Sequence, residues 1–399
     1  MSAFGYFGYF DYNATTPMCP EASHALSEAL NHFGNPSSLY KLAKQSRDAM
    51  STARQQVACL INCTPAELVF TSGGTEANNW AIKGFLLACG AIGRVAQPTH
   101  IIISAIEHSS ILEIAAHLKR VFGFEITLLA PDVEGIIRAD RVKMALRDNT
   151  RLVSIMLMNN EVGTLQPVSD ISHVLHGREI HFHVDGVQAV GKIPVDVKVL
   201  GIDTLSFAGH KFCGPKGIGG LYVRSGVVLE PLLHGGGQEG GQRGGTEASA
   251  LITAMGVAAS IAAKTMPETI ARMVALRTRL IGQLQERIIG VAIHGSADKA
   301  TQAPNTLSVS IEGIRAESLA ALLDHVHGIQ VSIGSACSNN RSKSLSHVLL
   351  AMGLSETAIE STMRVSLGPL TTEDSLGRFV SAVEACIHML RRVSGESEV

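Results

Sequence analysis

The sequence carries little net charge and lacks the features of membrane and secreted proteins. Its 33 Lys and Arg residues nearly balance 35 Asp and Glu residues, so the formal net charge is −2, and nothing in it favours a nucleic-acid or anionic-membrane surface. No apolar run approaches the roughly 20 residues that span a bilayer. The start, MSAFGYFGYFDYN, lacks the basic segment and cleavage site of a signal peptide. We therefore expect a cytoplasmic protein that binds neither membranes nor nucleic acids directly.

Disulfide and metal-site spacings are also missing. The seven cysteines include no C-x-x-C pair, which argues against a disulfide framework and for a reducing compartment. Cys59 and Cys63 lie four residues apart on a predicted helix without a second pair, so we interpret them as core thiols. Cys337 differs, because it stands in the polar stretch IGSACSNN (333–340). A reactive thiol needs such access, whereas a structural thiol needs burial.

Helical and strand patterns alternate along the first part of the chain, which predicts an α/β fold. Helical patterns cover 46–61, 75–89 and 109–121. Near-continuous apolar strands separated by helices are typical of a mostly parallel sheet covered on both faces. The strand-length apolar runs are ELVF (67–70), HIIISA (100–105), RLVSIMLM (151–158), HFHV (181–184), DTLSF (203–207) and GGLYV (219–223).

The rest of the chain predicts a second, smaller α+β unit, as its length of 399 residues allows. Residues 247–290 form a long helical pattern almost free of breakers, which would bridge the two units. The strands and helices expected after it are TLSVSI (306–311), 316–326, IQVSI (329–333), 344–353 and 373–393.

Ligands of an open parallel sheet bind beyond the carboxyl ends of its strands. After residues 67–70 comes TSGGTEANN, a glycine turn in which Thr75 starts a helix. Backbone N–H groups at a helix N-terminus bind anions, and the spacing does not match the P-loop or dinucleotide motifs. From these residues alone, a phosphate site and a simple turn with an N-cap threonine are about equally favoured.

Chemically active side chains follow three other predicted strands. His108 follows 100–105, where a surface or satisfied histidine is the more frequent case. Asp185 ends the strand that carries His181 and His183, a weak metal signal without a third ligand. Lys211 follows 203–207; most lysines are solvated, but one held at the end of a buried strand has a lowered pKa and can form a Schiff base.

Together these groups are the parts of a pyridoxal 5'-phosphate site: a phosphate cradle, a carboxylate for the pyridine nitrogen and a lysine for the aldehyde. The sequence also resembles the cysteine desulfurases of the IscS/NifS group, within the aminotransferase class V, fold-type I pyridoxal phosphate enzymes. The matching motifs span nearly the whole chain: DYNATTP (11–17), FGNPSS (33–38), FTSGGTEANN (70–79), EHSS (107–110), NNEVGT (159–164), HVDGVQAVGK (183–192), SFAGHKFCGPKGIGG (206–220), RGGTE (243–247), GSACS (334–338) and RVSLG (364–368).

The resemblance implies roles for individual residues around the cofactor. Lys211 holds it as a Schiff base, and Asp185 pairs with its pyridinium nitrogen. Gln188 donates to the phenolate oxygen, and His108 stacks on the ring and moves protons. The remaining cofactor contacts implied are Gly74, Thr75, His210, Asn160 and, from the other subunit of a homodimer, Thr246.

The resemblance also implies the substrate and the reaction. Asn160 and Arg364 orient L-cysteine, with Arg364 taking its carboxylate as a bidentate fork. Cys337 takes the sulfur as a persulfide, which leaves L-alanine, and passes it to an acceptor protein such as a scaffold or carrier. The implied domains are a large cofactor-binding domain (17–255) and a small domain (1–16 and 256–399) that carries the loop of Cys337 (about 333–345).

Several positions depart from the family pattern. Ala208 replaces the usual hydroxyl residue before GHK, Tyr40 replaces a histidine, and the segment after Cys337 is one residue longer and has no proline. Two alternatives therefore stay open: another class V enzyme, either an aminotransferase, which does not need Cys337, or a selenocysteine lyase; and a non-catalytic cofactor-binding assembly partner. The sequence does not distinguish acceptors for iron–sulfur clusters, tRNA thiolation, nitrogenase or DNA phosphorothioation.

Overall fold

A seven-stranded sheet forms the larger part of the computed structural model, which describes residues 8–92, 98–333 and 345–394. The strand order is β1-β7-β6-β5-β4-β2-β3, and β7 alone runs antiparallel to its neighbours in this sheet. This confirms the predicted mostly parallel α/β sheet. The strands are β1 (Leu68–Thr71), β2 (His100–Ser104), β3 (Glu125–Leu129), β4 (Thr150–Ser154), β5 (His181–Asp185), β6 (Thr204–Ala208) and β7 (Gly219–Val223).

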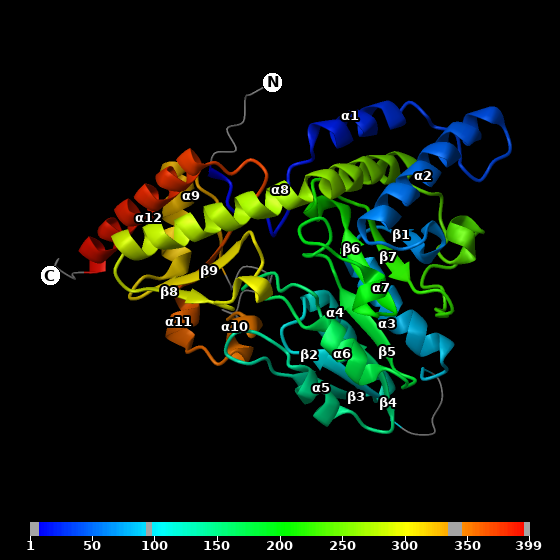
Figure 1. Cartoon of the computed structure of the whole chain (residues 1–399), viewed down its shortest axis with the longest axis horizontal. Helices are drawn as coiled ribbons and strands as arrows, with labels where there is room; N and C mark the ends of the chain where they lie inside the picture. Colours follow the sequence, from blue (N-terminus) through cyan, green and yellow to red (C-terminus); the bar gives the residue numbers. More distant parts are fainter. Residues whose placement is uncertain (1–7, 93–97, 334–344, 395–399) are drawn as a thin grey trace.

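Helices cover both faces of this sheet (Figure 1). Because side chains alternate along a strand, Ile101 and Ile103 of β2 pack with α3 and α4, whereas Ile102 belongs to the core on the opposite face. That second core is the larger one and includes side chains of α2, α5, α6, α7 and the first half of α8. The helices are α1 (Pro20–Ala29), α2 (Lys41–Leu60), α3 (Gly74–Ala88), α4 (Ser109–Phe122), α5 (Ala139–Ala145), α6 (Val168–Leu175), α7 (Val197–Leu200) and α8 (Ser249–Arg287).

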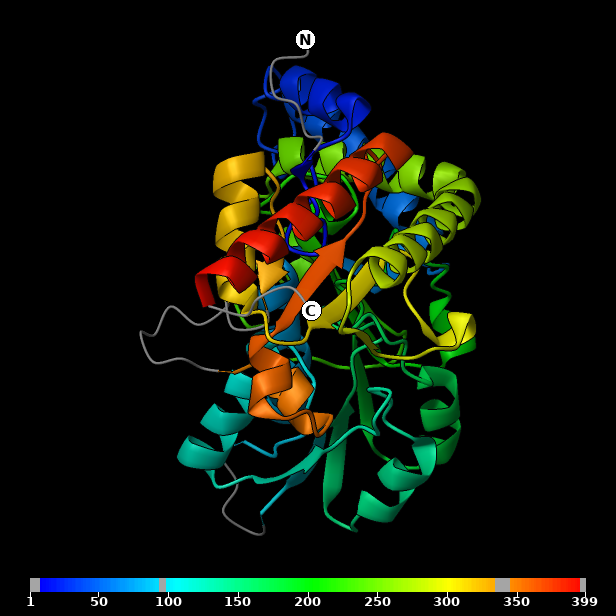
Figure 2. The ribbon, with the colours of Figure 1, turned by 90° about the vertical axis from the view of Figure 1, so that its left-hand side faces the viewer.

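The smaller part is built on a four-stranded antiparallel sheet in the order β10-β11-β9-β8. Its core contains side chains of α9, α12 and the second half of α8, and Figure 2 shows α12 lying across this end of the molecule. The elements are β8 (Val291–His294), β9 (Thr306–Ile311), α9 (Ala316–His327), β10 (Ser332–Ile333), α10 (His347–Ala351), α11 (Glu356–Glu360), β11 (Thr362–Ser366) and α12 (Glu373–Ser394).

Helix α8 joins the two parts, as its breaker-poor sequence predicted. Met255 lies in the core of the large sheet and Met266 packs against it, whereas Met273 and Leu280 lie in the core of the small sheet. The helix therefore crosses between the cores near Pro267. The domain ranges stay a prediction. By length and composition α8 could also span a membrane, with a mean hydropathy of 1.4 over its most apolar window, but its buried side chains serve these two cores.

The structure differs from the sequence predictions in several places, and strands β8 and β11 of the small sheet were not predicted. Strand β4 ends at Ser154 rather than at 158, although the backbone N–H groups of Ile155 and Leu157 still donate to β5 carbonyls. Strand β3 was missed, because its edge position leaves most of its residues partly exposed and weakens the apolar pattern. In the predicted strand 329–333, only β10 pairs as a strand. Cys59 is exposed rather than a core thiol, whereas Cys63 packs against the core.

Two glycines of α8 give a matched test of its packing on α2. A Cβ at Gly256 would lie 2.5 Å from Ala53 Cα, whereas a Cβ at Gly282 would meet nothing within 4 Å. We expect Gly256→Ala to lower the free energy of unfolding by about 1–3 kcal/mol through overpacking. We expect Gly282→Ala to raise it by up to about 1 kcal/mol, because alanine favours helix. Urea unfolding of both variants checks this; equal effects would contradict the packing described here.

Candidate active site

Asp185 is the buried anchor at the carboxyl end of β5, and only 4% of its surface is exposed. Asn78 on α3 donates from Nδ2 to Asp185 Oδ2 at 2.8 Å, and the backbone N–H of Val187 donates to Oδ1 at 2.9 Å. Asn78 is held in turn, because its Oδ1 accepts from Ser206 and lies 3.0 Å from Nε2 of His183. The carboxylate is therefore fixed in position and orientation.

The histidines of β5 support this arrangement rather than a metal. Burial lowers the pKa of both His181 and His183 to about 3, so both rings are neutral at physiological pH. His183 Nδ1 and His181 Nε2 each lie within 3.0 Å of the Thr204 hydroxyl. No cluster of three potential metal ligands occurs among the described residues. The H-x-H pattern is thus part of a hydrogen-bonded core.

The glycine turn after β1 places the N-terminus of α3 at the same edge of the sheet. Gly74 is the first residue of α3, and a Cβ there would lie 2.6 Å from Val187 Cγ2, two residues beyond Asp185. Glycine thus allows the helix end to approach the strand end. The exposed Thr75 follows within the first turn, where backbone N–H groups lack intrahelical partners and favour an anion.

Lys211 and His210 follow β6, the neighbour of β5, in a short 3-10 turn. Lys211 Nζ donates to the backbone oxygens of Asn13 and Ala14 at 2.5 and 2.8 Å. His210 Nδ1 lies 3.1 Å from Thr15 Oγ1. Burial, followed by repulsion from Lys211, Lys216 and Lys192, lowers the pKa of His210 to about 4, so its ring is neutral. The N-terminal segment therefore lies directly against the lysine.

His108 caps α4 at the end of β2, and its Nδ1 accepts from the backbone N–H of Ser110 at 3.1 Å. Desolvation lowers the pKa of His108; Asp185 opposes this shift, whereas Lys211 and His347 add to it. The neighbouring Glu107 is fully buried, and burial followed by repulsion from Asp185 raises the pKa of its carboxyl well above the usual range. Burial at this position thus favours the uncharged form of the Glu107 carboxyl.

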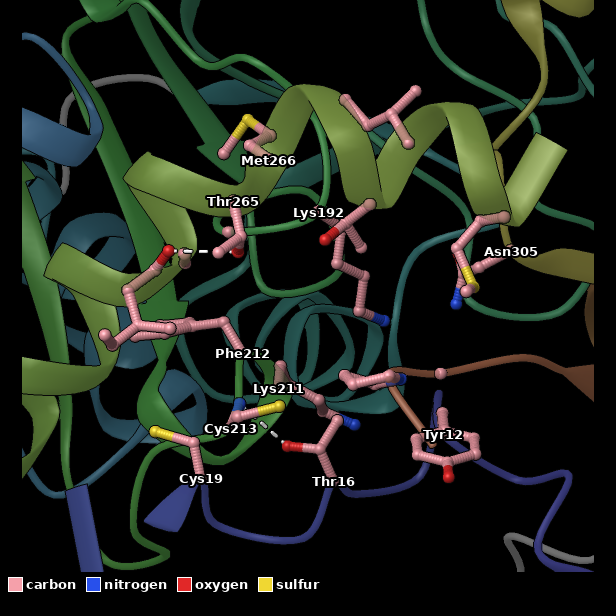
Figure 3. Close-up of a pocket in the computed structure, with 18 of the residues that line it drawn as sticks. Tyr12, Thr16, Cys19, Lys192, Lys211, Phe212, Cys213, Thr265, Met266 and Asn305 are labelled. Atoms are coloured by element: carbon pink, nitrogen blue, oxygen red, sulfur yellow. Dashed lines mark hydrogen bonds between the residues drawn. The ribbon is translucent and has the colours of Figure 1, made fainter. Parts of the chain in front are cut away.

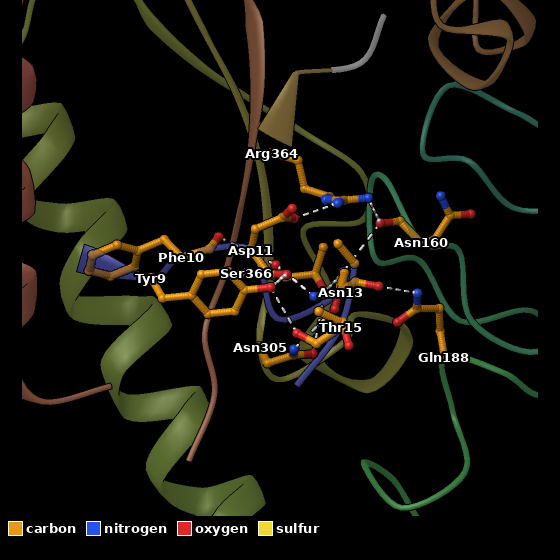
Figure 4. A network of polar contacts seen from close by, with 12 residues as sticks. Tyr9, Phe10, Asp11, Asn13, Thr15, Asn160, Gln188, Asn305, Arg364 and Ser366 are labelled. Carbon is orange, nitrogen blue, oxygen red and sulfur yellow. Dashed lines mark hydrogen bonds and ion pairs between the residues drawn. The ribbon is translucent and has the colours of Figure 1, made fainter. Parts of the chain in front are cut away.

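Arg364 on β11 reaches this edge from the small sheet (Figure 4). Its Nη2 donates to Asp11 Oδ1 at 2.6 Å, and its Nη1 donates to the backbone oxygen of Asn160 at 3.0 Å. Its Nε is buried without a hydrogen-bond partner. A buried guanidinium N–H without an acceptor is costly, so this edge of Arg364 suits a carboxylate ligand. Asn160 contributes its backbone oxygen to this arrangement.

A cavity of about 320 Å³ lies beside the lysine (Figure 3). Its wall is mainly apolar and comes from α8, the N-terminal segment and the turn after β6. Lys192, Lys211 and Asn305 supply polar groups along it, and Phe212 and Met266 supply apolar surface. Asp185, His108 and Arg364 are not among the residues that line this cavity, so of these groups it adjoins Lys211 alone.

Thr246 belongs to the glycine-rich loop before α8, at a small pocket that Ser72 also lines. Two ion pairs fix this loop on its own chain: Arg54 Nη2 to Glu239 Oε1 at 2.5 Å, and Arg243 Nε to Glu76 Oε1 at 3.0 Å. Glu76 follows Thr75 at the start of α3. The loop is therefore anchored beside the proposed phosphate cradle.

The structure thus brings Gly74, His108, Asp185, Lys211 and Arg364 to one edge where the two sheets meet. Cys337 lies outside the described residues. Sequence reasoning gave no role to Asn13, Asn78 or Lys192, although all three stand inside motifs quoted for the resemblance. A buried amide next to a predicted anion site, as in TEANN, is the signal that could have indicated Asn78.

The comparisons with known proteins agree with this geometry. The aminotransferase class-V family matches residues 8–379. The chain belongs to this family. It is 42% identical over 387 residues to the cysteine desulfurase IscS of Dictyoglomus turgidum, covering 97% of this chain and 96% of the relative. It is 41% identical to the IscS of Methanosarcina thermophila, covering 97% and 93%.

Solved structures of similar proteins share the fold of this chain. A NifS-like protein superposes with a TM-score of 0.87 at 35% identity, covering 96% of this chain and 99% of that one. SspA in complex with cysteine superposes with a TM-score of 0.79 at 37% identity, covering 92% and 100%. The fold is therefore that of the fold-type I pyridoxal phosphate enzymes.

Pyridoxal 5'-phosphate is the cofactor of this class V enzyme, and the described residues fit it. Glycine at position 74 lets the N-terminus of α3, whose free backbone N–H groups favour an anion, approach the turn that follows β5. The doubly hydrogen-bonded Asp185 carboxylate suits a ring nitrogen that must stay protonated. The amino group of Lys211 lies at the end of the adjacent strand.

Asn78 gives a direct test of how the carboxylate is held. Asn78→Ala removes the donor to Asp185 Oδ2, and a hydrogen bond to a charged group contributes about 1.5–3 kcal/mol. We expect it to weaken binding of pyridoxal phosphate to apoprotein about tenfold or more. Asn79→Ala, which removes a bond to the Thr75 backbone oxygen, is the neighbouring control and should bind nearly as wild type. Absorbance titrations measure both; equal affinities for Asn78→Ala and wild type would refute the role.

Proposed function

We propose that this protein is a cysteine desulfurase that converts L-cysteine to L-alanine and takes up the sulfur as a persulfide on Cys337. The full-length similarity to proteins named cysteine desulfurase IscS supports the activity. The similarity to SspA in complex with cysteine supports the substrate.

One observation favours a sulfur transferase over an aminotransferase. Strand β10 pairs with β11 so that Ser332 lies opposite Arg364, and Cys337 follows five residues later in the sequence. The strand that leads toward the cysteine thus runs beside the proposed carboxylate anchor. An aminotransferase has no use for a thiol that follows this strand in the sequence.

Each side chain then has a task in the proposed site. Arg364 binds the substrate carboxylate through its unpartnered Nε edge, while Asp11 and the Asn160 backbone keep the guanidinium oriented. The side chain of Asn160 is proposed to help to orient the bound substrate and cofactor. Asp185 holds the protonated ring nitrogen and Gln188 donates to the ring oxygen. The phosphate is held by Gly74, Thr75 and His210, with Thr246 from a second subunit.

Three groups move protons and sulfur. Bound pyridoxal phosphate supplies an electron sink for the charge left when the substrate loses its Cα proton. Lys211 Nζ, which anchors the cofactor, takes that proton when freed, and His108, kept neutral by its lowered pKa, accepts the proton of the substrate thiol. The Cys337 thiolate attacks the sulfur of the substrate thiol as His108 takes the thiol proton. The new S–S bond forms as the C–S bond breaks, the electron pair of the C–S bond passes to the β-carbon, and protonation of that carbon gives the methyl group of alanine.

The proposal also covers the oligomeric state of the protein, its sulfur acceptor and its cellular compartment. Thr246 would complete the site of a neighbouring copy, so the active unit is a C2 homodimer. The persulfide passes to a scaffold or carrier protein. The six described cysteines are all free, which supports a reducing, cytoplasmic setting.

The role of the Cys337 thiol as sulfur carrier is tested by Cys337→Ala. Cys59→Ala, at an exposed position of α2, is the matched control. With L-cysteine and a dithiol reductant, we expect wild type and Cys59→Ala to release alanine and sulfide in equal amounts. Cys337→Ala should lose turnover by about a thousandfold or more while still binding the cofactor. If Cys337→Ala turns over normally, the thiol is not the sulfur carrier and the desulfurase mechanism fails.

The shared site is tested by complementation between inactive chains. Thr246→Asp places a carboxylate against the phosphate bound by the neighbour, and Lys211→Ala removes the cofactor anchor of its own site. Each variant alone should be inactive. Mixing and reassembly should restore about a quarter of wild-type activity, because half of the dimers are mixed and each has one intact site. No recovery from dimers shown to be mixed would contradict the assignment of Thr246.

A further inference from the structure

The amino group of Lys192 lies between two amide side chains behind the proposed cofactor site. Its Nζ donates to Gln188 Oε1 at 2.7 Å and to Asn13 Oδ1 at 3.0 Å. Gln188 Nε2 donates in turn to the backbone oxygen of Asn13 at 2.9 Å. The three residues therefore form a closed ring of hydrogen bonds, and both amide-bearing residues are buried.

Donor and acceptor chemistry fixes the orientation of both amides. A backbone carbonyl can only accept, so the nitrogen of the Gln188 amide must face the Asn13 oxygen and its Oε1 must face Lys192. The same holds for Asn13, whose Nδ2 faces the backbone oxygen of Asn160 at 3.2 Å and whose Oδ1 therefore faces Lys192. Without the lysine, Gln188 Oε1 would lose the donor that this ring supplies.

We propose that Lys192 is a positioning residue: it locks the Gln188 amide so that its NH₂ group is presented to the ring oxygen of pyridoxal phosphate. One N–H of that amide is used by the Asn13 backbone, and an amide nitrogen carries two. The second N–H is the donor that the ring oxygen needs. This inference rests on the role of Gln188 in the proposed function.

A second effect of Lys192 must be separated from positioning. Lys192 is surrounded by ionisable groups: burial first, then Lys211 and Arg364, lower its pKa well below the usual range, while Cys213 and Asp11 act in the opposite direction. A charged Lys192 would also act on the cofactor through space, without Gln188. The experiment must therefore distinguish a Coulombic effect from one that passes through the amide.

The experiment is a double-mutant cycle on the holoenzyme with Gln188→Leu, Lys192→Met and the double variant. The readout is the pKa that governs the pH-dependent visible absorption of the bound cofactor. A donor at the ring oxygen stabilises its negative charge and favours the deprotonated chromophore, so losing the donor raises this pKa. We expect an upward shift of about one unit in each single variant. The double variant should shift no further than Gln188→Leu alone.

Lys192→Gln adds a variant that keeps a donor without a charge, and it remains informative if Lys192→Met does not fold. Positioning predicts a smaller shift for Lys192→Gln than for Lys192→Met, whereas a Coulombic effect predicts equal shifts. Additive shifts in the cycle, or a Lys192→Gln shift as large as that of Gln188→Leu, would overturn the inference. If Gln188→Leu itself leaves the absorption unchanged, the proposed role of Gln188 fails instead.

Discussion

The candidate site depends on Asn13, a buried residue of the N-terminal segment that lies where the two sheets meet. Its side-chain amide forms hydrogen bonds with groups of both parts. Nδ2 donates to the Thr306 hydroxyl at 2.8 Å and to the Asn160 backbone oxygen, and Oδ1 accepts from Asn305 and Lys192. Its own backbone oxygen accepts from Gln188 and Lys211. One residue thus fixes groups that belong to several strand ends.

This arrangement explains why the two parts act as one site. The large sheet supplies Asp185 and Lys211, and the small sheet supplies Arg364, whose guanidinium bonds to the same Asn160 oxygen as Asn13 does. A substrate that bridges Arg364 and a cofactor on Lys211 would have to span this junction. A small shift between the sheets would change that distance, and hydrogen bonds to a buried amide resist such a shift because breaking them leaves polar groups unsatisfied.

Much of the fold was predictable from the sequence, because strands of the central sheet are continuous apolar runs and α8 is almost free of breakers. Lys211 and Asp185 could be found for the same reason: each directly follows such a run. Asn13 could not, because its role depends on hydrogen bonds across more than 100 residues of sequence. Lys192 bonds to Gln188 nearby in the sequence, but its second partner is the same Asn13. Strand β3 was missed because edge exposure weakens its pattern.

The most direct test of this account is the effect of Asn13→Ala on kcat/KM for L-cysteine, with Asn31→Ala at an exposed position as control. The substitution removes four side-chain hydrogen bonds, each contributing about 1 kcal/mol. We predict that kcat/KM falls about tenfold to a thousandfold and that affinity for pyridoxal phosphate falls with it. A folded Asn13→Ala protein with wild-type values of both would show that the junction does not depend on this residue.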